Sequence, residues 1–404
     1  MNAATDVLIA GAGPAGCATA IACAKRGLEV LLLDRGRFPR DKACGEGILP
    51  AGVGALAELG LLATVRREST RLGGVGFQVD ERNGAVVEAA FSDQDGLPSF
   101  GLGVRRLLFD AQLLDAARAY PTVTVLEEVD AQSPLYAHDR VVGLMTSIGA
   151  IRARAVVAAD GLRSKLRTAL GLAKRPRPHE SARVGLRVHL RVPALPFGTR
   201  VRVLVGRRLE HYVTPVGPHE VQVAILGTRA DFLAAKLSAT TLVDHLGRHR
   251  ILGPLLDGAQ FLDRPLGAGP FHQRVRGVVT DGALLVGDAA GYVDAITGEG
   301  IGAALRQGLA AGNTLALALT NTPRRAPITA TMLASYTRAH TKITRDADRL
   351  TKIILFLARH HELARRAVQT LARRPALFER LLRVQAGVPL SSLPIGDWAR
   401  LVAG

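Results

Sequence analysis

The sequence predicts an α/β fold in which a parallel-sheet domain is joined to a second, antiparallel-sheet domain and to a C-terminal helical segment. Three observations predict it. DVLIAG, GAGPAG, an Ala-rich stretch and LEVLLLDR follow one another as strand, turn, helix and strand. Alternating apolar and polar residues between 182 and 226 indicate antiparallel strands with one covered face. From about 332 onward, apolar residues recur at three- and four-residue spacing opposite Arg and Lys, as in amphipathic helices.

The first domain is predicted to be discontinuous in sequence. A helical pattern at 105–120 and short strands up to 161 continue it, and GALLVGDAAG at 282–291 again places glycines after an apolar run. A buried, Ala-rich helix is expected at 300–319. The predicted boundaries are 1–71, 93–181 and 271–325 for the first domain, 72–92 and 182–270 for the second, and 326–404 for the helical segment, which Pro375 and Pro389 break into pieces.

The 404 residues carry a formal net charge of +17, which raises nucleic acid, anionic membrane surfaces and acidic ligands as partners. Between 338 and 383 there are twelve Lys or Arg and four Asp or Glu, a net of +8, so nearly half of the excess lies in one segment. With 11 Phe, 5 Tyr and 1 Trp and no helix-turn-helix or zinc pattern, nucleic-acid binding is not expected. The basic segment is either a solvated helical face or a peripheral membrane contact.

The cysteines and histidines do not indicate a disulfide framework or a metal site. Cys17, Cys23 and Cys44 include no CxxC pair, and His360 and His361 have no carboxylate pair at ligand spacing. The uncharged run at 7–24 contains three glycines and a proline, which argues against a membrane span. We therefore expect a cytoplasmic protein without a metal.

The glycine-rich hexapeptide at 11–16 has the G-x-G-x-x-G spacing and lies between a predicted strand and a predicted helix. Gly11 permits the tight turn, Gly13 lets the backbone approach a pyrophosphate, and Gly16 lets helix and strand pack closely. The phosphates then rest on the helix N-terminus. Asp34 ends the next strand, 23 residues after Gly11, where its carboxylate can accept hydrogen bonds from both ribose hydroxyls. An Asp at this place favours FAD or NAD over NADP.

A second glycine-rich stretch, GDAAGYVDAITGEGI at 287–301, follows an apolar run and opens the helix expected at 300–319. Two nucleotides, or one long cofactor gripped at both ends, would each explain it. DKACGEG at 41–47 and an R-x-x-F-D pattern at 106–110 lie between the two loops. With these four motifs in this order, the chain resembles the flavoprotein hydroxylase superfamily, and within it the geranylgeranyl-reductase-like branch, over most of residues 5–320.

The resemblance implies one cofactor, FAD, gripped at both ends, and NAD(P)H as its electron donor. Towards the adenosine end it implies contacts from Pro14, Ala15, Gly16, Asp34 and Arg35, with a backbone contact from Val129 to the adenine. Towards the flavin it implies Cys44, Gly45, Arg106 on the phosphates or ribityl chain, Asp160, Gly287, Asp288 on the ribityl hydroxyls, and Gly298, Gly300 and Ile301 on the ring. A helix N-terminus aimed at the pyrimidine side of the ring stabilises the anionic reduced flavin.

The sequence departs from the family pattern in two places. Ala295 stands where related hydroxylases carry proline. EHYVTPVG at 210–217 stands where geranylgeranyl reductases show Tyr-x-Trp-x-Phe-Pro, and the tryptophan box of flavin halogenases is absent because Trp398 is the only tryptophan. His211 and Tyr212 are the expected substrate contacts, of which only one can face inward because a strand alternates its faces.

The resulting hypothesis is an FAD-dependent oxidoreductase, namely an NAD(P)H-driven monooxygenase that hydroxylates a small apolar metabolite of aromatic or polyketide type in secondary metabolism. The alternative is an isoprenoid carbon–carbon double-bond reductase. A membrane-surface or nucleic-acid-binding protein is an alternative of another class, against which GDAAG and DKACGEG argue, since a binding module does not need both flavin ends. The sequence singles out no catalytic acid or base and no oligomeric state.

Overall fold

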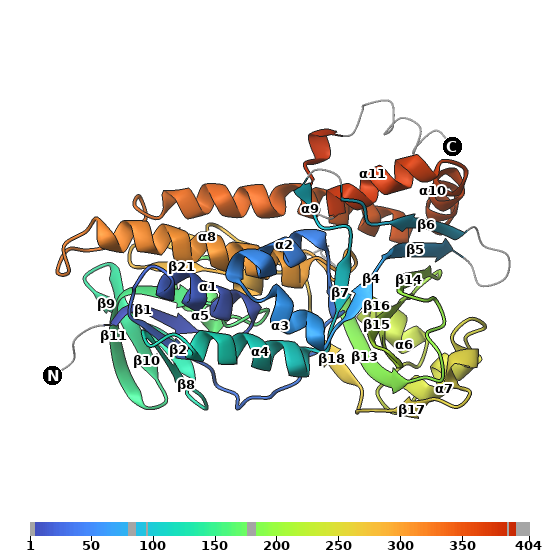
Figure 1. Cartoon of the computed structure of the whole chain (residues 1–404), viewed down its shortest axis with the longest axis horizontal. Coiled ribbons are helices and arrows are strands. Elements are labelled where there is room, and N and C mark those ends of the chain that lie inside the picture. Colours follow the sequence, from blue (N-terminus) through green and yellow to red (C-terminus); the bar gives the residue numbers. More distant parts are fainter. Residues whose placement is uncertain (1–4, 80–85, 94–95, 176–182, 386–387, 393–404) are drawn as a thin grey trace.

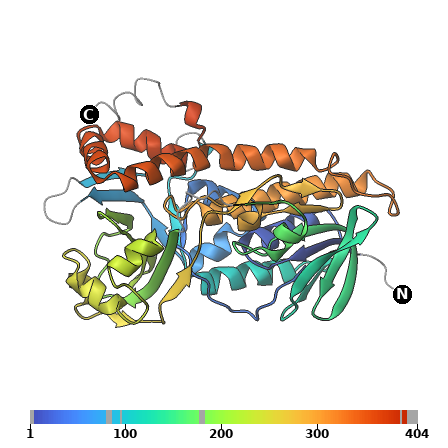
Figure 2. The same cartoon turned by 180° about the vertical axis from the view of Figure 1, so that it is seen from behind.

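The computed structural model describes residues 5–79, 86–93, 96–175, 183–385 and 388–392. Two eight-stranded sheets lie side by side along the long axis of the molecule, and the C-terminal helices run along one side of both (Figure 1). Figure 2 shows the same arrangement from behind. The predicted fold class, with a parallel sheet, an antiparallel sheet and C-terminal helices, is confirmed.

The first sheet has a parallel core. Its order is β21 (Ala283–Leu285), β11 (Gly149–Ala158), β1 (Thr5–Ala10), β2 (Val30–Leu33) and β8 (Val123–Leu126). Antiparallel strands complete it at the margins, namely β20 (Val279–Thr280), β9 (Ala131–Ala137) and β10 (Arg140–Thr146). Helices α1 (Pro14–Ala24) and α4 (Arg106–Arg118) pack on it, and α5 (Lys165–Ala169) packs near β9.

Four of the sequence motifs follow directly after strands of this parallel core. The hexapeptide at 11–16 follows β1, Asp34 follows β2, the segment with Asp160 follows β11, and GDAAG follows β21. The carboxyl ends of parallel strands meet at one edge of a sheet, and ligands bind outside that edge in α/β proteins. The topology therefore gathers motifs that are almost 300 residues apart at a single edge.

Helix α8 (Gly300–Thr320) packs against α1 at backbone distance. A Cβ atom at Gly308 would lie 2.6 Å from the carbonyl oxygen of Ala15, and one at Gly312 would lie 2.5 Å from the Cβ of Ala22. The Ala-rich face of α1, which is buried throughout, meets these glycines. The two helices are therefore held together by residues that have little or no side chain.

The second sheet has the order β17 (Gln260–Phe261), β13 (Arg183–Arg191), β16 (Glu220–Thr228), β15 (Glu210–Gly217), β14 (Arg200–Val205), β5 (Gly74–Val79) and β6 (Val86–Ala90), with β18 (Leu266–Ala268) also paired to β13. Helices α6 (Arg229–Ala234), α7 (Leu242–Arg248) and the short η2 (Gly253–Leu256) cover one face. Between the two large sheets lie β3 (Gly47–Ile48), β4 (Thr70–Leu72) and β7 (Gly101–Gly103), which form a three-stranded sheet. Helices α2 (Pro50–Leu59) and α3 (Leu62–Arg67) connect β3 to β4. A further pair joins β12 (Ala173–Lys174) to β19 (Arg274–Val275).

The second sheet differs from its sequence-based description in two respects. β5 pairs with β14 in parallel, because β5 enters from a distant segment of the chain and no hairpin fixes its direction. Both faces of the sheet are covered, not one: all eight residues of β15 are buried. Alternation alone misses this burial because Thr214, Glu210 and His211 are polar residues at buried positions.

The C-terminal segment forms α9 (Ala334–Arg359), α10 (His361–Arg373), α11 (Pro375–Gln385) and η4 (Leu390–Ser392). Pro375 opens α11, as expected, but α9 ends at Arg359 without a proline, because the next residue, His360, leaves the helical region with a φ of −120° and a ψ of 78°. α10 and α11 lie against β5 and β6 (Figure 1). Among the described residues, no helix is both long and apolar enough to cross a membrane.

We expect Gly308→Ala to lower the free energy of unfolding by about 1–3 kcal/mol, because the added methyl group overpacks the α1–α8 contact. Gly54→Ala is the matched control. Gly54 lies in α2, where a Cβ would meet nothing within 4 Å, so the same change should be neutral or stabilise by up to about 1 kcal/mol. Denaturant unfolding measures both values; equal effects of the two changes would contradict the packing argument.

Candidate active site

A cavity of about 200 Å³ lies at the shared edge of the first sheet and extends to the inner face of the second sheet. At one end it is lined by the glycine loop at Gly13–Ala15, and in its middle by both Cys44 and Gly300. At the other end its walls are apolar, from residues such as Val75 and Leu226. A ligand that fills it would be polar at one end and would meet hydrocarbon at the other.

The first loop adopts the geometry that its spacing predicts. Gly11 has a φ of +109°, and a Cβ atom there would lie 2.3 Å from the carbonyl oxygen of Ala159. A Cβ atom at Gly16 would lie 1.8 Å from the carbonyl oxygen of Gly11. Pro14 occupies the first turn of α1, where its missing N–H costs no hydrogen bond. The loop therefore presents its backbone and the helix N-terminus to the cavity.

Asp34 is buried and organises the adenosine end of the site. One carboxylate oxygen accepts a hydrogen bond from the backbone N–H of Ala12 at 2.8 Å, and the other accepts one from Gly36 at 2.8 Å. Arg40 forms an ion pair with Asp34 at 3.1 Å and with Asp110 at 3.4 Å. Arg35, by contrast, is exposed and lies outside the cavity wall.

Sequence reasoning missed Arg40, which lies 4.0 Å from the position of a Cβ at Gly13 and so stands over the phosphate-binding loop. Basic residues occur at 35, 37, 40 and 42, and no spacing rule selects one of them. Lys42 is the second residue missed. Its ammonium group lies 3.9 Å from Asp288, and it lines the cavity.

Arg106 is held rigidly in the cavity wall. Its guanidinium group donates to Asp110 at 2.6 Å through both Nε and Nη2. Burial alone would lower the pKa of Arg106, but the Asp110 carboxylate raises it well above its ordinary value. The side chain is thus a fixed positive charge beside the cavity, as a contact to phosphate or ribityl oxygens requires.

Val129 and Asp160, which the family resemblance implies as cofactor contacts, both form hydrogen bonds within the protein. The backbone N–H of Val129 donates to the carbonyl oxygen of Asp34 at 3.0 Å, which leaves only its carbonyl group for an adenine contact. The carboxylate of Asp160 accepts from the Ser164 hydroxyl at 2.5 Å and from the Leu166 N–H at 3.1 Å, so it caps α5. The neighbours of Asp160, Ala159 and Gly161, line the cavity in its place.

The second glycine-rich loop faces the same cavity as the first. Gly287, with a φ of +61°, donates its N–H to Gln307 at 2.7 Å, and Asp288 follows it in η3 (Gly287–Ala290). Gly298, Gly300 and Ile301 line the cavity where α8 begins. The positive end of the α8 dipole therefore points at the ligand space.

The second sheet holds this loop from the other side. Tyr212 lines the cavity and donates its hydroxyl hydrogen to the carbonyl oxygen of Ile296 at 2.9 Å. Arg183 forms ion pairs with Glu210 at 2.7 Å and with Asp294 at 2.9 Å. His211 lies on the opposite face of β15 and stacks on His245, with ring centroids 5.3 Å apart. Of the two expected substrate contacts, the structure brings only Tyr212 to the cavity.

The residues present fit FAD. At Gly45, which lines the cavity, neither a positive φ nor any protein atom within 4 Å of a Cβ requires glycine. A flat ring bound against the backbone here would account for the missing side chain. With a phosphate loop at one end and a helix N-terminus at the other, fold and site define a flavoprotein oxidoreductase that grips one FAD molecule at both ends.

Comparison with known proteins agrees with this class. Residues 4–348 match the family model described as "FAD binding domain". The chain is 31% identical over 331 residues to the menaquinone reductase of Mycobacterium tuberculosis (strain H37Rv), covering 77% of this chain and 76% of that one. It is 30% identical over 356 residues to digeranylgeranylglycerophospholipid reductase 1 of Methanothermobacter thermautotrophicus, covering 82% and 81%. A solved flavoprotein/dehydrogenase from Cytophaga hutchinsonii superposes with a TM-score of 0.80 at 22% identity, over 95% and 92%.

The chain therefore belongs to the FAD-binding-domain family of the flavoprotein hydroxylases, and it is an FAD-dependent oxidoreductase.

We expect Asp288→Ala to weaken FAD binding at least tenfold, because hydrogen bonds to a charged group contribute about 1.5–3 kcal/mol. The control is Asp257→Ala, at an exposed Asp outside the cavity, which should leave the dissociation constant unchanged. Flavin fluorescence during titration of the apoprotein gives both constants, and chromatography of released cofactor identifies it. FMN in place of FAD, or equal affinities for the two variants, would contradict the assignment.

Proposed function

We propose that the protein is a reductase that adds hydrogen across a carbon–carbon double bond in the isoprenoid chain of a lipid. The relatives reported above at 30% identity or more are named for the reduction of menaquinone and of digeranylgeranylglycerophospholipid. Both compounds are lipids with isoprenoid chains. The observation that carries the proposal is the apolar half of the cavity, which matches a hydrocarbon chain and offers few groups to a polar metabolite.

The distal wall of the cavity is built by the inner face of the second sheet. Val75 and Phe77 of β5 and Val203 of β14 form one part, and Leu226 and Phe271 form another. Tyr212 and Thr214 stand where bulky aromatic residues would narrow the space. Burial of apolar surface contributes about 25 cal/mol per Å², so such a wall binds an isoprenoid chain by contact area without directional bonds.

In this proposal a bound flavin that has first been reduced would supply a hydride to one carbon of the double bond, a proton from solvent would complete the second new C–H bond, and the flavin would be left oxidised. NAD(P)H is the proposed reductant that restores it. The protein's own residues bind and orient the cofactor and the lipid. The fixed charge of Arg106 and the Lys42–Asp288 pair would hold the polar half of the cofactor, and the apolar wall would hold the isoprenoid chain beside the flavin.

Hydroxylation of an apolar aromatic or polyketide-like metabolite is the second candidate. The same FAD site and the same water-excluding wall would serve it, and the family to which the chain belongs is that of the flavoprotein hydroxylases. Oxygen distinguishes the two candidates, because hydroxylation consumes O₂ and double-bond reduction does not.

We expect NAD(P)H-dependent saturation of a polyprenyl lipid under anaerobic conditions, followed by mass spectrometry as a gain of two mass units per bond. Ala224→Phe, which puts a ring into the cavity wall, should lower this rate at least tenfold because overpacking a filled site costs about 1–3 kcal/mol. Ala234→Phe puts the same ring on the exposed end of α6 and should have no effect. A hydroxylated product formed only in air would overturn the reductase proposal in favour of the second candidate.

We further propose that the basic C-terminal helices bring the protein to an anionic membrane surface, where such a lipid is found. α9 and α10 carry nine Lys or Arg and three Asp or Glu. Ile353, Phe356 and Leu363 are exposed on them, by 37%, 54% and 39%. Lys and Arg residues next to exposed apolar side chains are typical of helices that bind at a membrane surface.

The covered sides of α10 and of the neighbouring α11 pack against residues that line the cavity. Val368 of α10 and Phe378 of α11 belong to the apolar cluster that includes Val75 and Tyr212. The ring centroids of Phe378 and Phe77 are 5.7 Å apart, and Phe77 lines the cavity. One thin layer of helix therefore separates the proposed lipid-facing surface from the proposed lipid-binding wall, which supports a short path for the substrate.

We expect binding to vesicles of phosphatidylglycerol that weakens as salt rises, because each Lys or Arg near such a surface contributes about 1 kcal/mol before screening. Phe356→Glu should reduce co-sedimentation severalfold. Leu233→Glu, at a side chain that is 79% exposed on α6, is the matched control and should not. Absence of binding at low salt would leave the tail as a structural cap.

A further inference from the structure

Two neighbouring residues of the second sheet hold the Cys44–Glu46 segment of the cofactor site. His189 of β13 and Gln222 of β16 are register partners across the strand pair. The Gln222 amide donates a hydrogen bond to the carbonyl oxygen of Cys44. The Nε2 atom of His189 lies 2.5 Å from the Oε2 atom of Glu46. The second sheet therefore hydrogen-bonds to both neighbours of Gly45, the residue at which we expect the flavin ring.

The backbone conformation of Glu46 is unfavourable by itself, which indicates that the contacts of this segment stabilise it. Glu46 has a φ of +58°, a left-handed conformation that costs a non-glycine residue about 1 kcal/mol or more. The segment has glycine on both sides, at 45 and 47, yet not at this position. The side chain of Glu46 is fully buried, and its other oxygen accepts the backbone N–H of Arg106 at 2.7 Å, at the first residue of α4. Contacts of the carboxylate therefore hold the backbone in place.

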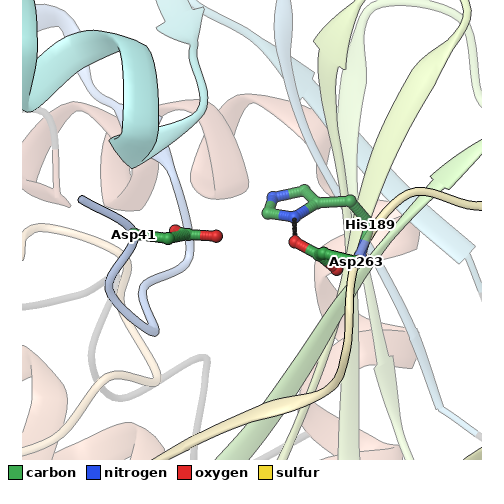
Figure 3. A group of neighbouring side chains, drawn as sticks. All are labelled: Asp41, His189 and Asp263. Carbon is green, nitrogen blue, oxygen red and sulfur yellow. Dashed lines mark hydrogen bonds and ion pairs between the residues drawn. The ribbon is translucent and has the colours of Figure 1, made fainter. Parts of the chain in front are cut away.

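The second ring nitrogen of His189 faces another carboxylate. Its Nδ1 atom lies 2.5 Å from Asp263, which also accepts the backbone N–H of His189 at 3.0 Å. Figure 3 shows the imidazole and Asp263 pointing at each other, with Asp41 reaching towards them from the segment beside the cofactor site. The guanidinium group of Arg187 contacts Asp263 at 2.7 Å and Asp41 at 2.5 Å, so a cation already lies between the two carboxylates, and we infer no metal site.

A buried imidazole between two carboxylates needs a proton on each nitrogen. Every N···O contact of 2.5 Å holds one hydrogen, so loss of a proton leaves two lone pairs facing each other between side chains that are fully buried at the Glu46 contact. Burial alone would lower the pKa of His189, but the hydrogen bonds to Glu46 and Asp263 raise it above its ordinary value. The other charges around the group are Arg187 of the same strand, Arg105, which contacts Asp263 at 3.4 Å, and Asp41.

We propose that His189 and Gln222 are positioning residues of the FAD site, which press the Cys44–Glu46 segment against the flavin ring, and that the His189 contact depends on its Nε2 proton. The proposal requires no particular substrate. Gln222 is neutral, so one half of this clamp is independent of pH and the other half is not.

The raised pKa of His189 determines how the FAD affinity should change with pH. A histidine whose pKa is raised in the folded protein contributes its full interaction below the ordinary histidine pKa and loses it as pH rises through the raised value. The clamp is therefore complete in mildly acidic solution and loses its His189 contact in alkaline solution. FAD affinity should fall with rising pH for this reason.

The test is the FAD dissociation constant of the apoprotein at about pH 6 and about pH 9, where an unshifted histidine passes from largely protonated to neutral. The wild type should bind at least tenfold more weakly at the higher pH. His189→Gln should bind weakly at both values and lose most of this difference. Gln222→Leu should bind more weakly at both values and keep the difference. Glu299, whose pKa burial raises to about 8, titrates in the same range but is present in all three proteins, so the comparison between them isolates His189.

Circular dichroism of bound FAD reports the surroundings of the ring and separates clamping from general stability. We expect the flavin bands of Gln222→Leu and His189→Gln to change while apoprotein melting temperatures stay close to wild type. Should His189→Gln not fold, Glu46→Gln replaces it: its amide can donate to a neutral imidazole, so FAD affinity should be nearly equal at both pH values. A pH dependence of wild-type size in His189→Gln or Glu46→Gln, or unchanged affinity and flavin bands in Gln222→Leu, would overturn the proposal.

Discussion

The rest of the structure depends on the backbone contact between α1 and α8. Each helix begins at a glycine loop after a strand of the same parallel sheet, so both helix N-termini point to the same edge. Gly308 and Gly312 let the two axes approach until side-chain methyls and carbonyl oxygens touch. This distance sets the spacing between the phosphate loop and the flavin loop. Two glycine motifs far apart in the sequence can therefore bind opposite ends of one FAD molecule.

The second sheet is attached to this frame by buried ion pairs and hydrogen bonds between charged groups. Arg183 joins the sheet to Asp294 in the flavin loop, and His189 joins it to Glu46 on the other side. Removing one partner of a buried ion pair is costly because the remaining charge has no water to solvate it. Such contacts are directional, unlike the apolar wall, so they fix the orientation of the wall relative to the cofactor.

The parts of the site that could be predicted from the sequence are those whose chemistry is local. Glycine spacing, an acidic strand end and a helix start are each encoded within a few residues. The contact of Arg40 with Asp34 was not predictable because no spacing rule selects it among the neighbouring basic residues. The contact of His189 was not predictable because its partner Glu46 lies 143 residues away in the sequence. Some local sequence patterns also led to incomplete predictions of a residue's role or of a helix end. Asp160 follows its strand as expected yet caps α5, and α9 ends at Arg359 without a proline because α10 turns to cover β5 and β6.

The order of strands in the first sheet has a consequence for biosynthesis. β1 leaves the ribosome long before β21 and α8, which lie in its sheet and cover α1 and which end at residues 285 and 320. At roughly 10 residues per second, about half a minute passes between them. During that time the Ala-rich face of α1 has no partner, while the second sheet is synthesised in between. Nascent chains are therefore most exposed to aggregation and to chaperones until α8 has emerged.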